Sequence, residues 1–553
     1  MDGGACGWCG EEAETKCTGC RQVFYCSKAC QKQGWERHKE ACRPFTVTKR
    51  KAVGRLLVAC RDLAVGEEIL SEVPLVLGPR QDTDPQEAER VCLGCYRRIS
   101  GEYKCSQCSW PLCGMKCESS PDHQPECSIT RAARVTIGHH CDQEAPNYPC
   151  DLVMTLRCLV EAGRDGAWGQ RWRTCTARLN TTRLQASTQQ EQQDQLQLEQ
   201  EHTQQMQDVI KMLREAFKLD TFPDINASDA SLMTILRLVK LNQVPTKMPY
   251  AEVIGLYPMA SLVSHSCMPN TKTLWKDGKL TVLASDPIAK GDPITGLYTD
   301  ILWGTRARRD HLRLTRLYHC SCRRCADPTE LDTNFSALVC RRCKKNVLPS
   351  NPLDDVAPWL CRGCGMEVSV KDAVSLSLSL GGTVEQALAN PTIDSLEALQ
   401  KEWLEKVHPN HYHLHAVKHS LLQLYGRTQE KAHTIDKDDI HWQEVDKKET
   451  ACKEFLTVCS RLDPSTAHTA HYVGLTFYEY NKTILQNALR SFAFKRISRQ
   501  QLKKRMLLSK ALLKKTMEIF RDEAPDTPES QLCHTCEEEV IQIGKWMLCV
   551  ELV

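Results

Sequence analysis

Cysteine and histidine pairs at short spacing fill the first 42 residues of the sequence. The pairs are Cys6-x2-Cys9, Cys17-x2-Cys20, Cys26-x3-Cys30 and His38-x3-Cys42, which together offer eight ligands. Thiolates and imidazoles are the ligands that zinc prefers, and a structural zinc site takes four of them. So short a segment cannot bury a large core, and metal binding would supply its folding energy. The pattern predicts two zinc sites in this segment.

The same order of ligand types recurs between residues 92 and 127, with slightly different gaps. These pairs are Cys92-x2-Cys95, Cys105-x2-Cys108, Cys113-x3-Cys117 and His123-x3-Cys127. Farther along, two Cys-x2-Cys pairs make a complete zinc-ribbon set, formed by Cys340, Cys343, Cys361 and Cys364. We therefore predict two more zinc sites in the first region and one in the second. Two weaker groups favour ordinary thiols: Cys533 with Cys536, and Cys141 and Cys150 near His139 and His140.

The stretch "YHCSCRRC" supplies Cys320, Cys322 and Cys325 but no fourth ligand nearby. Because a structural zinc site is normally four-coordinate, the missing ligand must come from elsewhere. Cys267, in "MASLVSHSCMPN", is a good candidate. Such a site would tie the middle of the chain to a distal loop and build a pocket between them. From the residues alone, His265 beside Cys267 could form a catalytic pair with it, be a second metal ligand, or belong to the core.

Length, charge and cysteine content limit the class of protein. The chain has 553 residues, which suggests roughly three or four domains, and its formal net charge of +3 gives no global field that would favour nucleic acid or membranes. Its 32 cysteines fit either a disulfide-rich secreted protein or a metal-rich intracellular one. The start "MDGGACGWCG" does not read as a secretory signal, and no apolar run reaches the roughly 18 residues of a membrane span. We therefore expect a zinc-rich protein of the cytoplasm and/or nucleus, without membrane or nucleic-acid partners.

Local patterns predict the elements that position these groups. The run "KTLWKDGKLTVLASDPI" has β-rich stretches on both sides of Asp277-Gly278, which predicts a hairpin. "KGDPITGLYTD" predicts a turn into a short strand that ends at Tyr298, and "TRARRDHLRLTRL" has the helical period and leads to Cys320. The glutamine-rich residues 185–207 fit either a polar helix or a disordered insert, and "DVIKMLREAF" then restores an amphipathic helix.

Helical patterns dominate after about residue 370. "SLEALQKEWLEKV", "HLHAVKHSLLQLYG" and "KETACKEFLTVCSRL" each place apolar residues at steps of three and four. No strict repeat is visible, so the sequence alone does not establish a tetratricopeptide array. The basic run at residues 495–515 is read as the solvated face of a helix, with a site for nucleic acid or an acidic partner as the alternative.

The stretch "GLYPMASLVSHSCMPN" resembles the centre of a SET domain of the SET-and-MYND lysine methyltransferase family, and residues 52–79, "AVGRLLVACRDLAVGEEILSEVPLVLGP", resemble its first half. With an extra finger in front, the chain is most similar to the arthropod-type branch. The resemblance implies how the ligands are shared within each finger. Its four sets are Cys6, Cys9, Cys26 and Cys30; Cys17, Cys20, His38 and Cys42; Cys92, Cys95, Cys113 and Cys117; and Cys105, Cys108, His123 and Cys127. With the other two sites, the chain would hold about six zinc ions.

The resemblance also implies a multidomain α+β fold, in which a β-rich SET domain is interrupted by a MYND zinc finger and a helical insertion. The expected parts are an N-terminal MYND finger (1–46), the first part of the SET domain (47–90), a second MYND-type finger (91–130), a helical insertion with the glutamine-rich segment (131–245), the SET core (246–303), a post-SET zinc site with the zinc ribbon (304–366), and an all-α, tetratricopeptide-like lobe (367–553).

By the same resemblance, the activity would be transfer of a methyl group from S-adenosylmethionine to a lysine of a histone or another protein, with transcriptional regulation as one setting. Tyr298 matches the catalytic tyrosine of the family. The residues expected at the methyl donor are Gly54, Arg55, Asn242, Ser264, His265 and Tyr318. His265 would contact the adenine mainly through its backbone, which argues against a role as general base.

Three positions depart from the family pattern and favour an alternative. Ser264 stands where the family usually has asparagine, Leu56 replaces the second glycine of a Gly-x-Gly loop, and Arg316 replaces a tyrosine that often lines the lysine channel. A cation in that channel would repel a lysine ammonium. The alternative is a SET scaffold with little or no turnover that acts as a zinc-rich adaptor. Its MYND fingers would bind proline-containing peptides of partner proteins, with Trp35 in the groove or, equally, as a cap on the finger's small core.

Overall fold

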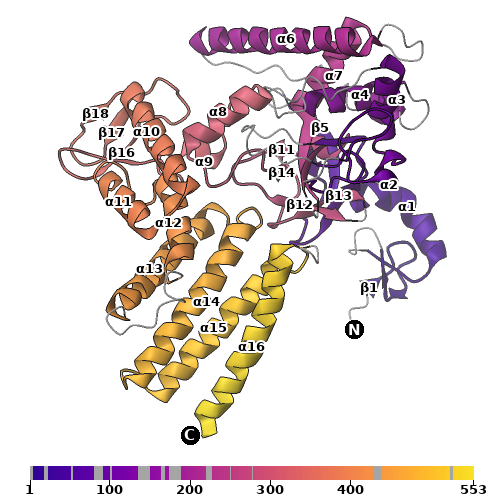
Figure 1. Ribbon diagram of the computed structural model, residues 1–553. Coiled ribbons are helices and arrows are strands. Elements are labelled where there is room, and N and C mark those ends of the chain that lie inside the picture. Colours follow the sequence, from indigo (N-terminus) through magenta and orange to yellow (C-terminus); the bar gives the residue numbers. More distant parts are fainter. Residues whose placement is uncertain are drawn as a thin grey trace. The chain divides into compact units, whose positions relative to one another are not determined.

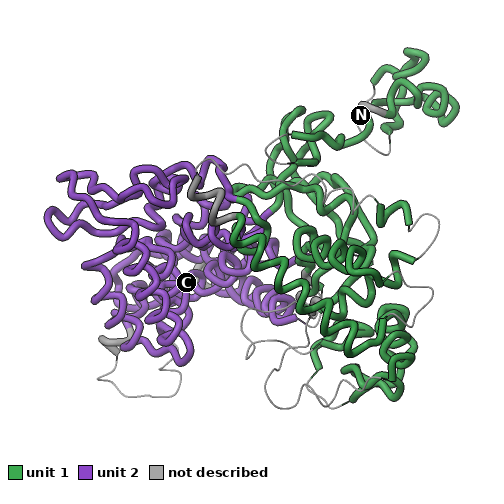
Figure 2. Tube along the Cα trace, turned by 90° about the horizontal axis from the view of Figure 1, so that it is seen from above, with its two compact units in different colours: residues 1–296, 313–318 green, residues 297–312, 319–553 purple. Residues whose placement is uncertain are grey.

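The computed structural model describes residues 4–17, 23–50, 54–79, 91–99, 103–134, 150–163, 169–173, 189–219, 227–248, 251–276, 278–426, 438–523 and 527–552. The chain divides into two compact units (Figure 2). Unit 1 comprises residues 1–296 and 313–318, and unit 2 comprises residues 297–312 and 319–553. The mixed helices and strands confirm the predicted α+β class. No helix of the described residues is long and apolar enough to cross a membrane.

The first segment of unit 1 is a small finger with short strands and one helix. Its elements are β1 (Gly4–Ala5), β2 (Glu12–Ala13), β3 (Thr15–Lys16), β4 (Phe24–Tyr25) and α1 (Lys28–Cys42). Strands β1 and β2 pair with each other, as do β3 and β4. Helix α1 begins after Ser27, whose hydroxyl accepts the Cys30 amide at 3.2 Å as an N-cap. The core consists largely of cysteines with Tyr25, so apolar burial alone supplies little stability here.

The rest of the β-structure in unit 1 forms several small sheets. Its strands are β5 (Phe45–Arg50), β6 (Gly54–Ala59), β7 (Glu68–Glu72), β8 (Val76–Pro79), β9 (Gln243–Lys247), β10 (Glu252–Leu256), β11 (Ser264–His265), β12 (Thr271–Lys276), β13 (Lys279–Ala284) and β14 (Thr295–Gly296). The sheet orders are β5-β6, β12-β13-β7 and β8-β10-β9, and the two-residue strands β11 and β14 run parallel. Inward-facing residues such as Leu57, Val253 and Val282 form the common core.

The predicted hairpin around Gly278 is confirmed, because β12 pairs with β13 from Lys276↔Lys279 outward and Gly278 has a φ of +71°. Asp277 lies outside the described residues. The expected strand before Tyr298 is shorter than predicted. β14 ends at Gly296, because its partner β11 offers only Ser264 and His265 for pairing.

Helices fill the span between the two halves of the β-structure. They are α2 (Met115–Glu118), α3 (Gln124–Ala133), α4 (Cys150–Ala162), α6 (Gln189–Phe217) and α7 (Asp229–Asn242). Helix α4 is almost wholly buried against β8, and the long α6 lies beside α7 (Figure 1). The part of the glutamine-rich segment that the structure describes is therefore helical, continuous with "DVIKMLREAF". Residues 185–188 of that segment lie outside the described ranges.

Unit 2 begins just after β14 and contains the zinc ribbon and the helical lobe. Its elements are α8 (Thr305–Arg316), whose last residues belong to unit 1, α9 (Arg323–Ala326), β15 (Leu338–Val339), β16 (Asn346–Pro349), β17 (Trp359–Cys361), β18 (Glu367–Val368), α10 (Val370–Ala389), α11 (Ile393–Trp403), α12 (Tyr412–Leu424), α13 (Asp438–Leu462), α14 (Ala470–Ala493), α15 (Arg499–Ile519) and α16 (Pro528–Leu552). Strands β15 to β18 form one antiparallel sheet. Helices α14, α15 and α16 lie side by side (Figure 1). The predicted helices of this region are all present.

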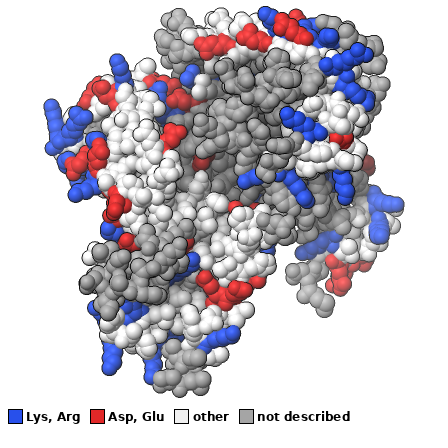
Figure 3. All heavy atoms as spheres, viewed as in Figure 1, with Lys and Arg blue, Asp and Glu red and all other residues white. Residues whose placement is uncertain are grey.

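The basic run falls on α15, which starts with a capping box formed by Ser498 and Gln501. On this helix Leu502, Met506, Leu512 and Leu513 are buried, Leu507 and Leu508 are exposed, and the lysines are exposed or half-buried. Lysines and arginines are interspersed with acidic residues over the described part of the face seen in Figure 3. This arrangement fits the solvated-face reading of the run.

Candidate functional site

In the first finger, the structure brings Cys6, Cys9, Cys26 and Cys30 together, with their sulfurs within 4.8 Å of one another. The Cys9 and Cys26 sulfurs are 3.5 Å apart. Of the other predicted set, the Cys17 and Cys42 sulfurs are 3.7 Å apart and His38 is buried, whereas Cys20 lies outside the described residues. The geometry therefore supports the ligand sets implied by the resemblance, in which the first and third pairs hold one ion and the second and fourth pairs hold the other.

The second finger assembles both of its predicted sets. Cys92, Cys95, Cys113 and Cys117 form one group, and Cys105, Cys108, His123 and Cys127 form the other, each within 4.8 Å. In the ribbon of unit 2, the loops at the ends of β15 and β17 bring together Cys340, Cys343, Cys361 and Cys364.

The spacing of these atoms fits a tetrahedral zinc ion. With a Zn–S bond of about 2.3 Å, two sulfurs of a tetrahedron should lie about 3.8 Å apart, and a nitrogen and a sulfur about 3.6 Å apart. The measured distances are 3.6 Å for Cys340 and Cys364, 3.9 Å for Cys105 and Cys127, and 3.4 Å for Cys108 Sγ and His123 Nε2. A disulfide would need about 2.05 Å. These groups therefore have the donor atoms and the geometry for structural zinc.

The electrostatics of these thiols also favour a cation. Backbone amides, first that of Cys9, lower the pKa of Cys6 to about 6, and the amide of Cys364 does the same for Cys361. Hydrogen bonding to the neighbouring Cys9 and Cys30 thiols instead raises the pKa of Cys26 to about 12. Four thiolates at this spacing repel one another, and a divalent ion at their centre removes that cost.

The imidazole of His123 is held by a fully buried polar network that the sequence did not reveal. Its Nδ1 lies 3.0 Å from Glu126 Oε1, which leaves Nε2 to face Cys108 and the metal position. Arg157 of α4 donates to both oxygens of Glu126, from Nε at 2.7 Å and from Nη2 at 2.6 Å. It also donates to the carbonyl oxygens of Leu77 and Leu93 at 2.6 and 2.9 Å. Partners of this kind orient a ligating imidazole and fix its tautomer.

The predicted post-SET site draws on both units. Cys267 belongs to unit 1, and Cys320, Cys322 and Cys325 belong to unit 2, so their shared ion stays a prediction. Within unit 1, His265 Nε2 lies 3.3 Å from Cys267 Sγ. This contact is compatible with each of the three readings given for the histidine from the sequence.

Two side chains that the sequence did not single out hold the "MASLVSHSCMPN" segment. Glu72 of β7 accepts the amides of Met259 and Ala260, both at 3.0 Å, at the start of the short helix η3 (Ala260–Leu262). Burial raises the pKa of Glu72, although these amides oppose the shift. At the other end, Asn270 Oδ1 accepts the Thr295 amide at 2.8 Å and its Nδ2 donates to Pro293 O at 3.0 Å. The segment is thereby fixed against β14, which leads to Tyr298.

All six residues expected at the methyl donor belong to unit 1. Asn242 ends α7 with 5 % of its surface exposed, and its Nδ2 donates to Leu238 O at 3.1 Å. Ser264 is buried, and the rings of His265 and Tyr318 have centroids 6.4 Å apart. Tyr298 lies two residues beyond β14, at the start of unit 2, so its relation to the other residues stays a prediction.

Besides Ser264, the two other departures from the family pattern, Arg316 and Leu56, can now be placed. Arg316 donates from Nη1 to Leu241 O at 2.7 Å and from Nη2 to Gln243 O at 2.6 Å, so its guanidinium is bound to backbone carbonyls. Leu56 is only 2 % exposed and belongs to the protein interior. In the same strand, Gly54 has a φ of +77°, a conformation that favours glycine. Arg55 follows it, half-buried, on β6.

The weaker cysteine candidates differ in what surrounds them. Cys536 of α16 is buried among apolar side chains that include Leu502 and Ile543, and the Cys533 thiol lies 4.0 Å from the Met517 carbonyl oxygen. Both observations fit ordinary helix packing. Cys141, His139 and His140, together with the side chain of Cys150, lie outside the described residues.

Comparison with known proteins matches residues 6–42 to the MYND finger family. Over 330 residues the chain is 27 % identical to the SET domain-containing protein SmydA-8, isoform A, of Drosophila melanogaster, a match that covers 58 % of this chain and 64 % of that protein. Over 442 residues it is 24 % identical to the histone-lysine N-methyltransferase ASHR1 of Arabidopsis thaliana, covering 78 % and 84 %. Over 296 residues it is 27 % identical to human histone-lysine N-methyltransferase SMYD3, covering 51 % and 60 %.

Among solved structures, the SET domain of LSMT bound to lysine and AdoHcy aligns with 82 % of this chain and 92 % of that one, at 12 % identity and a TM-score of 0.30. So weak a structural likeness supports no further argument. The chain matches just under two thirds of the length of the Drosophila relative. The finger match and the sequence relatives nevertheless agree with the order of zinc ligands and with the SET-type segments on either side of the second finger. In its finger match and in its relatives, the chain is similar to SET-and-MYND proteins.

Proposed function

We propose that the chain is an S-adenosylmethionine-dependent protein-lysine N-methyltransferase. The observation that carries the proposal is the position of residues 316–318 in unit 1. Arg316 binds the carbonyls on both sides of Asn242, and two residues later the Tyr318 ring lies beside His265. Arg316 thus approaches the end of α7 and Tyr318 approaches β11, and the family resemblance assigns Asn242, His265 and Tyr318 to the methyl donor. The matched relatives ASHR1 and SMYD3 are histone-lysine methyltransferases.

Each residue has a role that its chemistry allows. The bound cofactor would supply an electrophilic methyl group on a sulfonium sulfur. The flat ring of Tyr318 suits the face of an adenine, and the Asn242 amide suits the charged amino-acid end. The Tyr298 hydroxyl would accept weak C–H···O contacts from the methyl group and so orient it. The attacking lysine must be neutral, and removal of its ammonium from water lowers its pKa and favours that form.

The experiment is methyl transfer from labelled S-adenosylmethionine to histones and to a cell-extract protein mixture, with the zinc sites loaded. We expect labelled lysine in the product and loss of transfer in Tyr298→Phe, with binding of S-adenosylmethionine retained. Ser264→Asn and Leu56→Gly should tighten cofactor binding if the departures only weaken the site. Absence of transfer by the wild-type protein to every substrate would contradict the proposal. Both the nucleus and the cytoplasm supply such substrates, and we place the protein in one or both.

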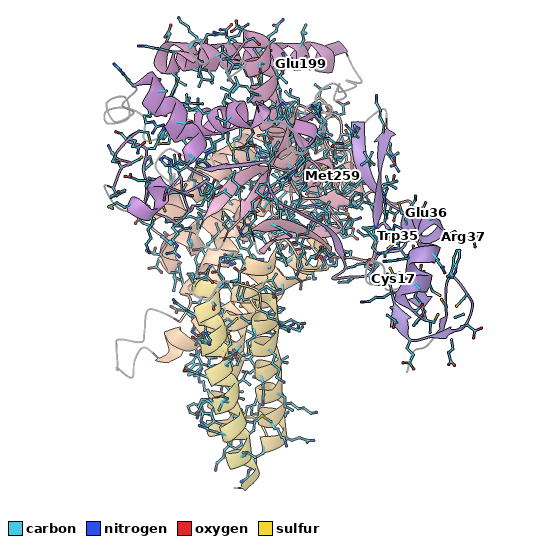
Figure 4. The ribbon with its side chains drawn as sticks, turned by 90° about the vertical axis from the view of Figure 1, so that its right-hand side faces the viewer. Cys17, Trp35, Glu36, Arg37, Glu199 and Met259 are labelled. Atoms are coloured by element: carbon cyan, nitrogen blue, oxygen red, sulfur yellow. The ribbon has the colours of Figure 1, made fainter. Side chains whose placement is uncertain are left out.

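A specific observation favours a second function for the first finger. Trp35 and Trp8 are 43 % and 39 % exposed on it, and the Arg37 guanidinium lies 5.2 Å from the Trp8 ring centroid. Figure 4 shows Trp35, Glu36 and Arg37 side by side on α1. Exposed aromatic rings of this kind fit proline-containing peptides, which prefer aromatic-lined grooves. Peptide-array binding that is lost in Trp35→Ala but kept in Tyr298→Phe would support this adaptor role, and no binding by the isolated full chain would refute it.

A further inference from the structure

The junction between α7 and β9 carries the residue on which the proposed cofactor site depends. Helix α7 ends at Asn242, and the chain turns at once into β9, because Gln243 is extended (φ −58°, ψ 136°) while its amide still bonds Val239 O. The last carbonyls of a helix have no intrahelical donor, so such a junction needs outside partners. The helix itself and the bond from Asn242 Nδ2 to Leu238 O hold this residue from one side, and partners for the neighbouring carbonyls would hold the turn from the other.

Arg316 supplies these partners from the end of α8. Its two terminal nitrogens donate to the carbonyls of Leu241 and Gln243 at 2.7 and 2.6 Å, one residue before and one residue after Asn242. The guanidinium is planar and its donors form a fixed fork, so the two carbonyls are held at a set distance and orientation. A cation at a helix C-terminus is also favoured by the helix dipole.

We propose that Arg316 is a positioning residue for the methyl donor, which acts through Asn242 and does not repel lysine in the substrate channel. This inference rests on the proposed function. It predicts that a variant without the guanidinium binds the cofactor less well, because Asn242 is no longer held at the helix end.

The test is calorimetric binding of S-adenosylhomocysteine to the zinc-loaded full chain. We expect Arg316→Met, which keeps the apolar stem, to raise the dissociation constant about ten-fold, as would be expected for one lost polar contact. Arg316→Lys, which keeps the charge but not the fork, should fall between wild type and Arg316→Met. Arg237→Met is the matched control, because Arg237 is exposed on the same helix that carries Asn242. It should bind like wild type.

A double substitution separates positioning from general destabilisation. If Arg316 acts through Asn242, Arg316→Met combined with Asn242→Ala should bind no more weakly than Asn242→Ala alone. In turnover, Arg316→Met should raise KM for the methyl donor and leave KM for the protein substrate unchanged. A fall in KM for the protein substrate would instead show that the cation had opposed lysine entry, and would overturn the inference.

A measurement without ligand tests the clamp itself, that is, the two hydrogen bonds from Arg316 to the carbonyls of Leu241 and Gln243. Hydrogen exchange at the Gln243 amide should be faster in Arg316→Met than in wild type and Arg237→Met, because that amide bonds within the clamped turn. Unchanged exchange, or additive losses in the double variant, would overturn the inference even if wild type binds the cofactor. Failure of the wild type to bind S-adenosylhomocysteine, with the exchange result as expected, would instead remove the proposed function and with it the role of the clamp.

Discussion

Arg157→Met tests whether the second finger and the SET core are held by a buried charge network. Arg157 and Glu126 are both buried, and the guanidinium makes two hydrogen bonds to Glu126, two to backbone carbonyls and one to the Tyr96 hydroxyl. Methionine fills a similar volume but leaves Glu126 charged, with His123 as the one remaining side-chain partner among the described residues. Breaking a buried pair by removing one member costs about 3–5 kcal/mol. For a unit of this size that should lower the melting temperature by about 5–8 °C.

The assay is urea and thermal unfolding, together with zinc release followed by a metallochromic indicator. We expect Arg157→Met to unfold earlier and to lose zinc faster, because Glu126 no longer holds His123 in place. Arg131→Met is the matched control. Arg131 lies exposed on the same finger and donates to Gln107 at 2.9 Å, so its loss should cost less than about 1 kcal/mol.

Adding Glu126→Gln to Arg157→Met should not increase the damage, because the amide removes the buried charge that the first substitution leaves unpaired. Strictly additive losses would show that the two side chains act independently. Unfolding of Arg157→Met within about 1 kcal/mol of wild type, with normal zinc release, would refute the reasoning.

Three further predictions concern one half-buried polar group, Asn270, and two buried ones, Glu330 and His411. Asn270→Ala should lower the free energy of unfolding by about 1–3 kcal/mol, measured by urea, because it leaves polar backbone groups of β14 and its flank without partners. Glu330→Gln should cost about 3–5 kcal/mol in unit 2, because it leaves the buried guanidiniums of Arg308 and Arg324 without their carboxylate; burial alone would raise the pKa of Glu330, but these arginines lower it to about 2. His411 is buried at the start of α12, and burial lowers its pKa from 6.5 to about 3. Its contribution to stability is therefore complete above pH 6.5 and declines as the pH falls toward 3, by about 2 kcal/mol between pH 7 and 5.

Each of these has an outcome that would contradict it. Asn270→Asp keeps the acceptor and should be milder than Asn270→Ala; equal losses would mean that the amide acceptor is not what matters. Wild-type-like unfolding of Glu330→Gln would show that solvent reaches the arginines. His411→Asn keeps a side-chain cap and should flatten the loss of stability between pH 7 and pH 5; an unchanged slope would assign it to other groups.

Features that depend on residues close together in the sequence, such as zinc-ligand pairs, hairpins and amphipathic helices, were predicted well. Zinc ligands lie in pairs with two or three residues between them, so the fingers and the ribbon could be found without knowing the fold. The hairpin at Gly278 and the helices after residue 370 follow from equally local patterns. Tertiary contacts over long separations were not predictable in this way. Glu126 and Arg157 are 31 residues apart, and no spacing rule joins them.

The candidate site shows the same division. Its residues could be named from the family resemblance, but the side chains that hold them in position could not be predicted from the sequence. Nothing in the sequence marked Glu72 as the acceptor for the Met259 and Ala260 amides, since the carboxylate is 187 residues away from the first of them. Arg316 was expected to face an incoming lysine and instead binds carbonyls that flank Asn242. The strand expected to reach Tyr298 stops at Gly296, because pairing partners and not β-propensity set its length.

The most direct test of the methyl-donor site is calorimetric titration of the zinc-loaded wild-type chain with S-adenosylmethionine. We predict one saturable site per chain with a dissociation constant on the order of micromolar, weakened by Asn242→Ala. The absence of binding heat and of any competition by S-adenosylhomocysteine, with every zinc site filled, would contradict the account and leave the zinc fingers as the functional part of the molecule.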